Sequence, residues 1–412
     1  MNVDATASFS HALLHRADGD RLAIVDGERA VTYFALRAGV ARLGGALAAE
    51  GIADRDRVVI FGEPSAFTIS AYLAAIEAGG IAVPLGTSST DAELDAQIEA
   101  VAPRFAFLHE DVAARFASLG WSTGVEHIIV GPEPLRASHA SGVFERAPDD
   151  EDLIGIARIS FASSNPANVG DVRVVHVGHD NLRANTEAVV DALSLRPGDR
   201  TVLVLPLSDA FGASVLHSHL WASGTVHIGP TPALPEKIVH ALEESRATGF
   251  HGDGDTYASL LEEGDFAQRA LPHLRYVAQA RGKLPEALVD ALVGSAVPEV
   301  YLMYGQAEAT WLLSVVAVHA DPDKRASVGR GLPGTTLTVL SPDGTAAAPG
   351  ETGDVVATGP GVTRGYLDDL EASAERFRDG SLYTGDVGTI DEEGFVFLAD
   401  SLVDSSSEPP RE

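Results

Sequence analysis

The sequence contains no cysteine, so disulfide bonds, thiolate metal sites and a cysteine nucleophile are all excluded. Aromatic residues make up only 6% of the chain. Positive charge is also scarce, because 29 Lys and Arg stand against 59 Asp and Glu, for a formal net charge of −30. Binding to nucleic-acid backbones and anionic lipids depends on positive charge, so this composition argues against nucleic acid and membrane as partners.

A secretory signal and a long apolar run are missing as well. The N-terminus lacks a basic stretch followed by an apolar core. No apolar run approaches the roughly 20 residues that a helix needs to span a bilayer. These absences predict a soluble, cytoplasmic protein.

The sequence does contain apolar segments, in which strand-like and helix-like patterns alternate. The chain has 412 residues, of which 45% are hydrophobic, and this length is too great for one core. Residues 20–34 predict a hairpin around Asp26 and Gly27, since Asp-Gly is a strong turn pair. The segment that follows, up to residue 86, alternates strand and helix patterns in a β-α-β-α-β order. That order predicts a parallel sheet with helices on both faces.

We therefore predict an α/β protein with two doubly wound α/β subdomains and one small β-barrel-like subdomain. The two α/β subdomains are expected over residues 1–325, about 1–180 and 181–325, and interleaved. Residues 326–400 hold short β runs joined by Gly- and Asp-rich turns, which predicts the small β-rich subdomain. The polar end at 401–412 contains paired prolines and predicts a disordered tail.

Motifs in the second half of the chain carry a resemblance to a known family. In chain order they read YGQAEAT (304–310), GRGLPG (329–334), GETGDVVATGPGVTRGYLDD (350–369) and SLYTGDVG (381–388). Together they resemble the large N-terminal domain of the adenylate-forming superfamily, the AMP-binding acyl- and aryl-acid ligases that include the acyl-CoA synthetases. The resemblance implies that ATP and a carboxylate form acyl-AMP and pyrophosphate with the help of Mg²⁺. The acyl group then usually passes to a thiol.

The resemblance assigns roles to four residues. Tyr304 matches the aromatic residue that stacks on adenine, and Gly305 follows it in the same motif. Glu308 matches the acid that helps hold Mg²⁺, and Asp386 matches the carboxylate that accepts from the ribose hydroxyls. A structural alternative remains open for three of them: a core aromatic for Tyr304, a helix-capping acid for Glu308, and a turn aspartate for Asp386.

The segment that matches the phosphate loop departs from the family. The family's loop is rich in Ser, Thr and Gly and ends in lysine. Here Gly170 is kept and Arg173 stands in the place of the lysine, while most of the other loop glycines are absent. Ser163 and Ser164 could still donate to a phosphate. The loop therefore indicates either a weakened phosphate site or an ordinary polar surface loop.

The segments that match the acyl pocket depart from the family too. Asp209 replaces an aromatic residue or histidine, and Arg281 replaces a pocket glycine. An apolar wall is replaced by FHGDGDTY (250–257), which introduces three polar side chains. Since a buried charge needs a partner, we expect Arg281 to face an acid. The predicted pocket residues are Asp209, Phe211, His251, Asp253, Asp255, Gln279, Arg281 and Gly282. Neutral drift in a site no longer used is the alternative.

The last departure concerns the family's hinge and mobile C-terminal lid domain. FLADSLVDSSSEPPRE (397–412) occupies the place of the hinge, and its arginine is missing. The resemblance therefore predicts a truncated protein without the lid domain and without the lysine that the lid supplies.

Three functions remain open, and the sequence leaves it uncertain whether the protein is an enzyme. The first is a non-standard member in secondary metabolism that acts on a small carboxylic acid or an activated acyl substrate, with impaired or lost adenylation. The second is a working acyl-AMP ligase completed by a partner chain, and the third a silent homologue that binds a ligand or partner. Binding of ATP, AMP and Mg²⁺ is expected to be weakened or lost, and a carrier protein or partner enzyme is a possible partner. The catalytic candidates are Glu308, Arg173 and His251.

Overall fold

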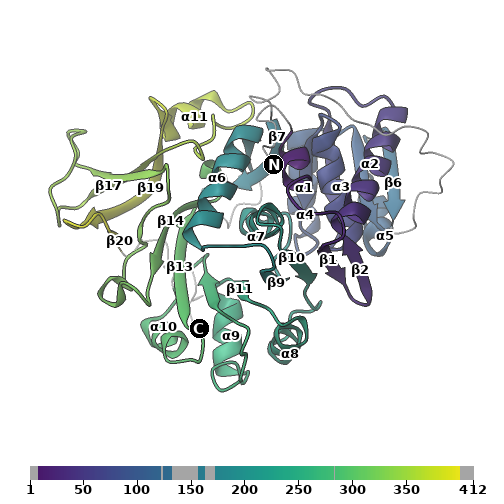
Figure 1. Cartoon of the computed structure of the whole chain (residues 1–412). Helices are drawn as coiled ribbons and strands as arrows, with labels where there is room; N and C mark the ends of the chain where they lie inside the picture. The colour runs from purple at the N-terminus through teal and green to yellow at the C-terminus, as the bar shows by residue number, and fades with distance from the viewer. Residues whose placement is uncertain (1–7, 122–123, 132–155, 163–171, 283, 400–412) are drawn as a thin grey trace, which may run out of the picture.

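The computed structural model describes residues 8–121, 124–131, 156–162, 172–282 and 284–399. Figure 1 shows helices packed among two large sheets, and a smaller β-rich part that contains β17, β19 and β20 at the left. The helices are α1 Phe9–Leu14, α2 Tyr33–Ala49, α3 Ala66–Glu77, α4 Asp91–Val101, α5 Glu110–Ser118, α6 His179–Ala192, α7 Ala210–Trp221, α8 Pro235–Ser245, α9 Gly254–Glu262, α10 Glu286–Val293 and α11 Leu370–Arg376, with short 3-10 turns η4 Ala307–Ala309 and η5 Pro322–Lys324.

The six-stranded sheet has the order β6-β5-β3-β4-β7-β8. All its neighbouring pairs are parallel except β7 and β8, which are antiparallel. Its apolar strands are typical of a sheet covered on both faces, and every residue of β4 is buried. The strands are β3 Arg57–Phe61, β4 Ile81–Leu85, β5 Phe105–His109, β6 His127–Gly131, β7 Ile156–Ala162 and β8 Arg173–Gly178.

The nine-stranded sheet has the order β15-β14-β13-β12-β11-β9-β10-β1-β2. The predicted hairpin is confirmed, because β1 and β2 pair antiparallel with Asp26 opposite Arg29. This hairpin extends the second large sheet, where β1 runs parallel to β10. The strands are β1 Leu22–Asp26, β2 Arg29–Thr32, β9 Arg200–Leu203, β10 Thr225–Ile228, β11 Gly249–Gly252, β12 Tyr276–Gln279, β13 Glu299–Gly305, β14 Leu312–Ala317 and β15 Arg330–Gly331.

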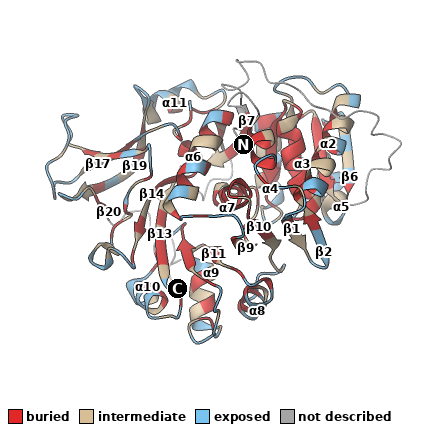
Figure 2. Cartoon of the chain, in the orientation of Figure 1, coloured by how far each residue is buried: buried red, intermediate tan, exposed pale blue. Residues whose placement is uncertain are grey.

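Buried helices connect the two large sheets in one hydrophobic core. Helix α3 contacts β1 of the nine-stranded sheet and β4 of the six-stranded sheet. Every residue of α7 except Ala210 is buried, and Figure 2 shows this helix in red at the centre of the molecule. A helix that is buried on all its faces needs neighbours on every side, and this position supplies them.

The third sheet is antiparallel, with the order β16-β17-β19-β18 and β20 beside β19. It follows the α/β part in sequence, as the short β runs predicted. Its strands are β16 Thr336–Leu340, β17 Gly353–Thr358, β18 Phe377–Arg378, β19 Ser381–Ile390 and β20 Val396–Leu398.

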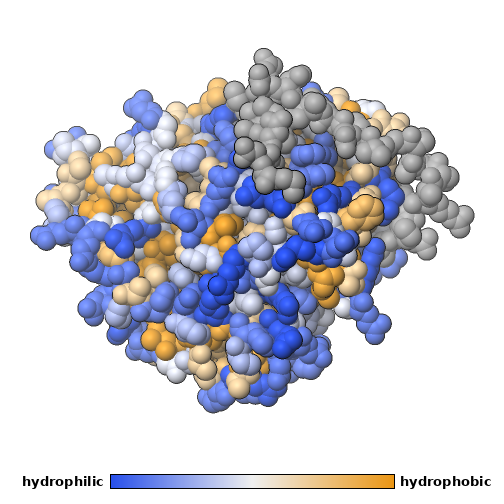
Figure 3. All heavy atoms as spheres, in the orientation of Figure 1, coloured by the Kyte–Doolittle hydropathy of each residue, from blue (hydrophilic) through white to orange (hydrophobic). Residues whose placement is uncertain are grey.

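Polar residues cover much of the visible molecular surface (Figure 3). Figure 3 shows hydrophilic residues over most of the visible face, with hydrophobic residues scattered among them. None of the helices in the described part of the chain combines the length and the apolar character that a bilayer crossing requires.

Candidate functional site

The turn between β13 and β14 places the residues of the YGQAEAT motif. A side chain at Gly305 would collide with the backbone carbonyl of Trp311, so only glycine allows this close approach. The backbone N–H of Gln306 donates to the same carbonyl at 2.8 Å. Thr310 has a positive φ of 69°, which is rare for a β-branched residue. These constraints fix the short helix η4, which carries Glu308.

Glu308 is buried, with only 6% of the residue exposed. Its Oε1 accepts a hydrogen bond of 2.7 Å from the hydroxyl of Tyr366. Arg376 lies next to it, with Nη2 3.9 Å from the same oxygen. A buried carboxylate is stable only with such partners, so Glu308 is held by a phenol and a guanidinium. It is not the solvated capping acid of the structural alternative.

Tyr304 and Asp386 contact each other directly. The Tyr304 hydroxyl donates to Oδ2 of Asp386 at 2.5 Å, and the side-chain amide of Gln306 donates to the same oxygen at 3.0 Å. Burial and the nearby charge of Asp386 raise the pKa of Tyr304 well above its ordinary value. The phenol therefore stays protonated and donates. The side chains matched to the adenine base and to the ribose are bound to each other.

Two arginines complete a continuous polar network. Arg376, the last residue of α11, donates from Nη2 to Oε1 of Gln306 at 3.2 Å and so joins the two acids. Arg173, the first residue of β8, places its guanidinium 5.4 Å from the ring centroid of Tyr366. Burial first, and then the charge of Glu308, raises the pKa of Tyr366 to about 12. Neither the motifs nor their spacing had assigned a role to Gln306, Tyr366 or Arg376.

Backbone pairing brings Tyr366 to this network. The N–H of Leu367 donates to the carbonyl of Val174 at 2.8 Å, so the segment around Tyr366 lies along β8. The two segments are far apart in sequence, and no spacing rule connects them. Tyr366 and Gln306 stand inside the quoted motifs, which was the signal for finding them. Arg376 had no signal, because it reads as one more charge in a polar helix.

The network still has unpaired donors that suit a phosphate. In the described part of the chain, the hydroxyl of Thr363, the Nε of Arg376 and the indole Nε1 of Trp311 are buried without a hydrogen-bond partner. The backbone N–H of Thr363 donates to the backbone carbonyl of Glu308 at 2.9 Å, so the two residues are neighbours. These donors fit an anionic group such as a nucleotide phosphate.

The site offers fewer ligands to Mg²⁺ than it offers donors to a phosphate. Within the described residues no group of three or more His, Cys, Asp or Glu side chains could hold a metal ion. Glu308 could supply one ligand, and Mg²⁺ is often bound through one or two carboxylates together with substrate phosphates. Tyr366 and Arg376 already occupy this carboxylate, and the cation of Arg376 would oppose a second cation there.

Aromatic rings link the network to the predicted acyl pocket. The Trp311 ring stacks on Phe211 with centroids 5.1 Å apart and an interplanar angle of 15°. His251, at 2% exposed, lies 6.0 Å from the Phe211 ring, edge to face. Neither ring nitrogen of His251 has a partner among the described residues. Burial lowers its pKa well below the ordinary value, so the imidazole is neutral.

The other predicted pocket residues occupy the ends of nearby strands and helices. Arg281 forms an ion pair with Asp209, which answers the expectation that it faces an acid. The arginine side chain is 54% exposed, so the pair lies at the surface and not in a closed pocket. Asp209 also caps α7, where it accepts from the N–H of Phe211. The buried amide of Gln279 donates to the carbonyls of Arg281 and Gly282.

The two remaining acids lie in the first turn of α9. Asp253 caps this helix by accepting from the N–H and the hydroxyl of Thr256 at 2.9 and 2.6 Å. Asp255 is exposed. Helix capping therefore explains why an aspartate stands at position 253, an explanation that was not considered from the sequence. The predicted phosphate-loop residues Ser163, Ser164 and Gly170 lie outside the described residues.

The fold and the site define a class of protein. The sequence profile of the family described as AMP-binding enzyme matches residues 12–367, so the chain belongs to this family. It is a member of the adenylate-forming superfamily, as the resemblance indicated.

Relatives of known activity lie at low identity. The chain is 27% identical to a feruloyl-CoA synthase from Amycolatopsis sp over 394 residues, which cover 93% of this chain and 76% of the relative. It is 26% identical to a 3-hydroxybenzoate–CoA ligase from Aromatoleum sp. (strain CIB), covering 92% and 73%. The ATP-bound MatB from Rhodopseudomonas palustris superposes with a TM-score of 0.83 at 26% identity, covering 95% of this chain and 78% of that one.

The fold also matches a structure of an isolated domain. The N-terminal domain of FACL13 from Mycobacterium tuberculosis superposes with a TM-score of 0.84 at 21% identity, and the match covers 95% of this chain and 100% of that one.

Proposed function

We propose that this chain binds an adenine nucleotide and a small carboxylic acid, and that its ATP-dependent adenylation is weaker than is usual for the family. One observation carries the proposal: the side chains matched to Mg²⁺ and to the ribose are held by other side chains of the protein. Glu308 is bound by Tyr366, and Asp386 by Tyr304 and Gln306. A ligand must therefore compete with these bonds for Oε1 of Glu308 and for Oδ2 of Asp386.

Each residue of the network then has a task in binding. Tyr304 offers its ring to the base, Asp386 offers two oxygens to the ribose hydroxyls, and the unpaired Nε of Arg376 offers a donor to a phosphate. Glu308 is the one candidate ligand for Mg²⁺ in this network. A bound ATP with Mg²⁺ would supply the phosphorus centre that the acid's carboxylate attacks. Arg376 supplies fixed positive charge, and fixed charge stabilises developing negative charge without reorganisation.

The acid itself is best matched by an oxygenated aromatic acid. The stacked rings of Phe211 and Trp311 provide apolar faces. The imidazole of His251 and the indole N–H of Trp311 have no hydrogen-bond partner among the described residues and provide polar groups. A ring that carries a hydroxyl or carbonyl could satisfy such groups, since leaving a buried donor unpaired costs about 1–3 kcal/mol. The names of two relatives, a feruloyl-CoA synthase and a 3-hydroxybenzoate–CoA ligase, support this choice. His251 then acts as a neutral recognition group.

Calorimetry and isotope exchange test the proposal together. We expect calorimetric titration to detect AMP binding, and pyrophosphate exchange to be slow with ferulate and 3-hydroxybenzoate. Fast exchange by the chain alone would overturn the weakened adenylation. No binding of AMP or ATP would favour the silent homologue. Exchange that appears only after a second protein is added would favour a ligase completed by a partner chain.

A further inference from the structure

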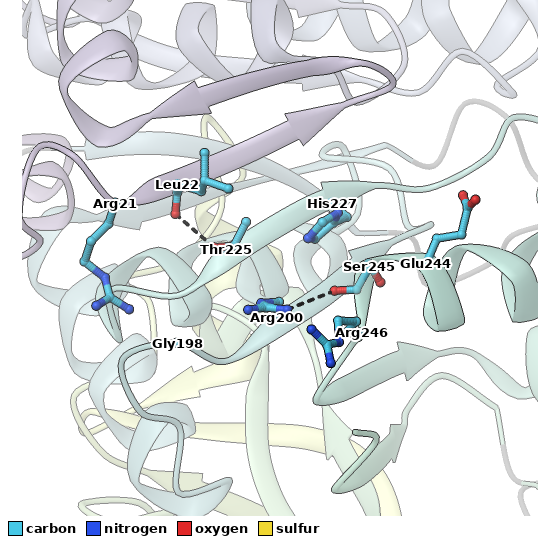
Figure 4. A pocket seen from close by; sticks show the side chains of 9 residues that line it. All are labelled: Arg21, Leu22, Gly198, Arg200, Thr225, His227, Glu244, Ser245 and Arg246. Atoms are coloured by element: carbon cyan, nitrogen blue, oxygen red, sulfur yellow. Dashed lines mark hydrogen bonds between the residues drawn. The ribbon is translucent and has the colours of Figure 1, made fainter. Parts of the chain in front are cut away.

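A second candidate binding site lies at the amino ends of parallel strands in the nine-stranded sheet. The first candidate site lies at the carboxyl ends. Arg200 and Thr225 begin the parallel strands β9 and β10, whereas Tyr304 lies near the end of β13, which runs in the same direction. The amino ends of β9 and β10 border a depression of about 440 Å³, which the C-terminal end of α8 closes on one side. Figure 4 shows its side chains. We call this site the basic pocket.

Three arginines line the basic pocket: Arg21, Arg200 and Arg246. In the described part of the chain none of them forms an ion pair, although acids outnumber Lys and Arg by 59 to 29 in the sequence. Glu244 is the one acid among the lining residues, and it pairs with His240 at 3.2 Å, on the solvent side of α8. Like charges held together repel, so an anion between them would be bound favourably.

Hydrogen bonds hold these three arginines in place, two of them to backbone carbonyls and one to a histidine. Nη1 of Arg200 donates to the carbonyl of Ser245 at 3.5 Å, and Nε of Arg21 donates to the carbonyl of Ser223 at 3.3 Å. Nε of Arg246 donates to the imidazole of His273 at 3.1 Å. A guanidinium carries about five N–H donors, so each arginine keeps several for a ligand. Anchoring lowers the entropy that a ligand would otherwise lose in ordering the side chains.

His227 adds a further polar group to the floor of the pocket. Burial first, and then the charge of Arg200, lowers its pKa to about 4, so the ring is neutral near pH 7. A neutral imidazole can donate one N–H and adds no repulsion to the three guanidinium groups. The pocket therefore presents donors on its floor and at its rim.

We propose that the basic pocket binds a small anion with two or more phosphate or carboxylate groups. Its volume falls in the range of about 300–1,000 Å³ that is typical of small-molecule sites. Three guanidinium groups match such an anion because each can form two parallel hydrogen bonds to a carboxylate or phosphate. This inference does not depend on the proposed nucleotide function.

Calorimetric titration of the full chain with citrate and with inorganic pyrophosphate tests the proposal, with AMP at saturation to occupy the nucleotide site. The test variant is Arg21→Gln/Arg246→Gln, since both side chains are exposed. The matched control is Arg42→Gln, an exposed arginine on α2 outside the pocket. We expect saturable one-site binding that weakens about tenfold or more in the double variant and is unchanged in the control.

A third variant keeps the proposal testable if the double variant fails to fold. Glu244→Gln removes the acid at the rim, so anion binding should tighten several-fold. Stronger binding of pyrophosphate would identify the ligand as phosphorylated, and stronger binding of citrate as a polycarboxylate. Equal affinity in wild type and double variant, no change in Glu244→Gln, or no binding of either anion would overturn the proposal.

Discussion

Replacing Tyr304 by phenylalanine should make AMP bind more tightly. The change removes the hydroxyl that donates to Asp386 at 2.5 Å and leaves the aromatic ring in place. The freed carboxylate oxygen then keeps only the bond from Gln306 at 3.0 Å. A ribose hydroxyl would no longer have to displace the phenol, so part of the energy of that bond returns as affinity.

The magnitude follows from the hydrogen bond that is lost. A bond to a charged group contributes about 1.5–3 kcal/mol, and the ligand recovers only the part it previously had to break. We expect a gain of about 1 kcal/mol, or roughly fivefold in the Kd for AMP. The ligand-free variant should lose about 1–2 kcal/mol in its free energy of unfolding, because Asp386 loses a partner.

Calorimetric titration with AMP measures this effect, with Tyr301→Phe as the matched control. Tyr301 lies on the same strand, and its hydroxyl also donates to a carboxylate, that of Glu299, at 3.2 Å. The control should leave the Kd unchanged. Weaker AMP binding by Tyr304→Phe, with the control unchanged, would refute the reasoning, since the hydroxyl would then itself contact the nucleotide.

Three further predictions concern single side chains. Arg376→Gln removes the guanidinium 3.9 Å from Glu308, so half-maximal ATP binding should need a lower Mg²⁺ concentration. The control Arg378→Gln should leave this concentration unchanged, and calorimetric titration with ATP at several Mg²⁺ concentrations measures it. Asp199→Ala removes a buried carboxylate that pairs with Arg275 at 3.1 Å and leaves this arginine paired with Glu299 at 3.1 Å, so it should lower the free energy of unfolding in urea by about 2 kcal/mol. Asp265→Ala removes an exposed acid that pairs with Arg269 and should lower the free energy of unfolding by less than about 1 kcal/mol. Equal losses for Asp199→Ala and Asp265→Ala would contradict the role of burial. The pKa of His219 is lowered to about 4, mainly by burial, so between pH 6.5 and pH 4 the unfolded chain binds the extra proton. Stability should therefore fall as the pH falls, by at most about 3 kcal/mol from this residue, and His219→Gln should flatten the dependence in urea melts at both pH values.

Local signals in the sequence predicted the elements of the fold well. The Asp-Gly turn predicted the hairpin of β1 and β2, and the alternating strand and helix patterns before residue 86 predicted β3 and β4. The place of that hairpin beside β10 was not predictable from these signals. Register and neighbours in a sheet depend on contacts between residues about 200 positions apart in sequence, such as Ile24 and Val226, which no local periodicity records.

The candidate site was also predictable in part: its residues could be named from the sequence, but their contacts could not. The motif text identified Tyr304, Glu308 and Asp386, because residue type and order survive in the sequence. Their mutual binding was not predictable, since it depends on side-chain directions in elements far apart in the chain. Asp253 was expected to line the acyl pocket because its segment matches that pocket in the family. The structure shows its carboxylate capping α9, a local role that the motif comparison did not indicate.

The sequence by itself determined the family, the order of helices and strands, and the acids and aromatic rings available for chemistry. The tertiary structure alone decided that Tyr366 and Arg376 hold Glu308. It also decided that three arginines, which form no ion pair within the described part of the chain, line one pocket at the amino ends of β9 and β10. The physical reason is that electrostatic and hydrogen-bond energies depend on distance and burial. Both quantities are set only when distant segments pack together.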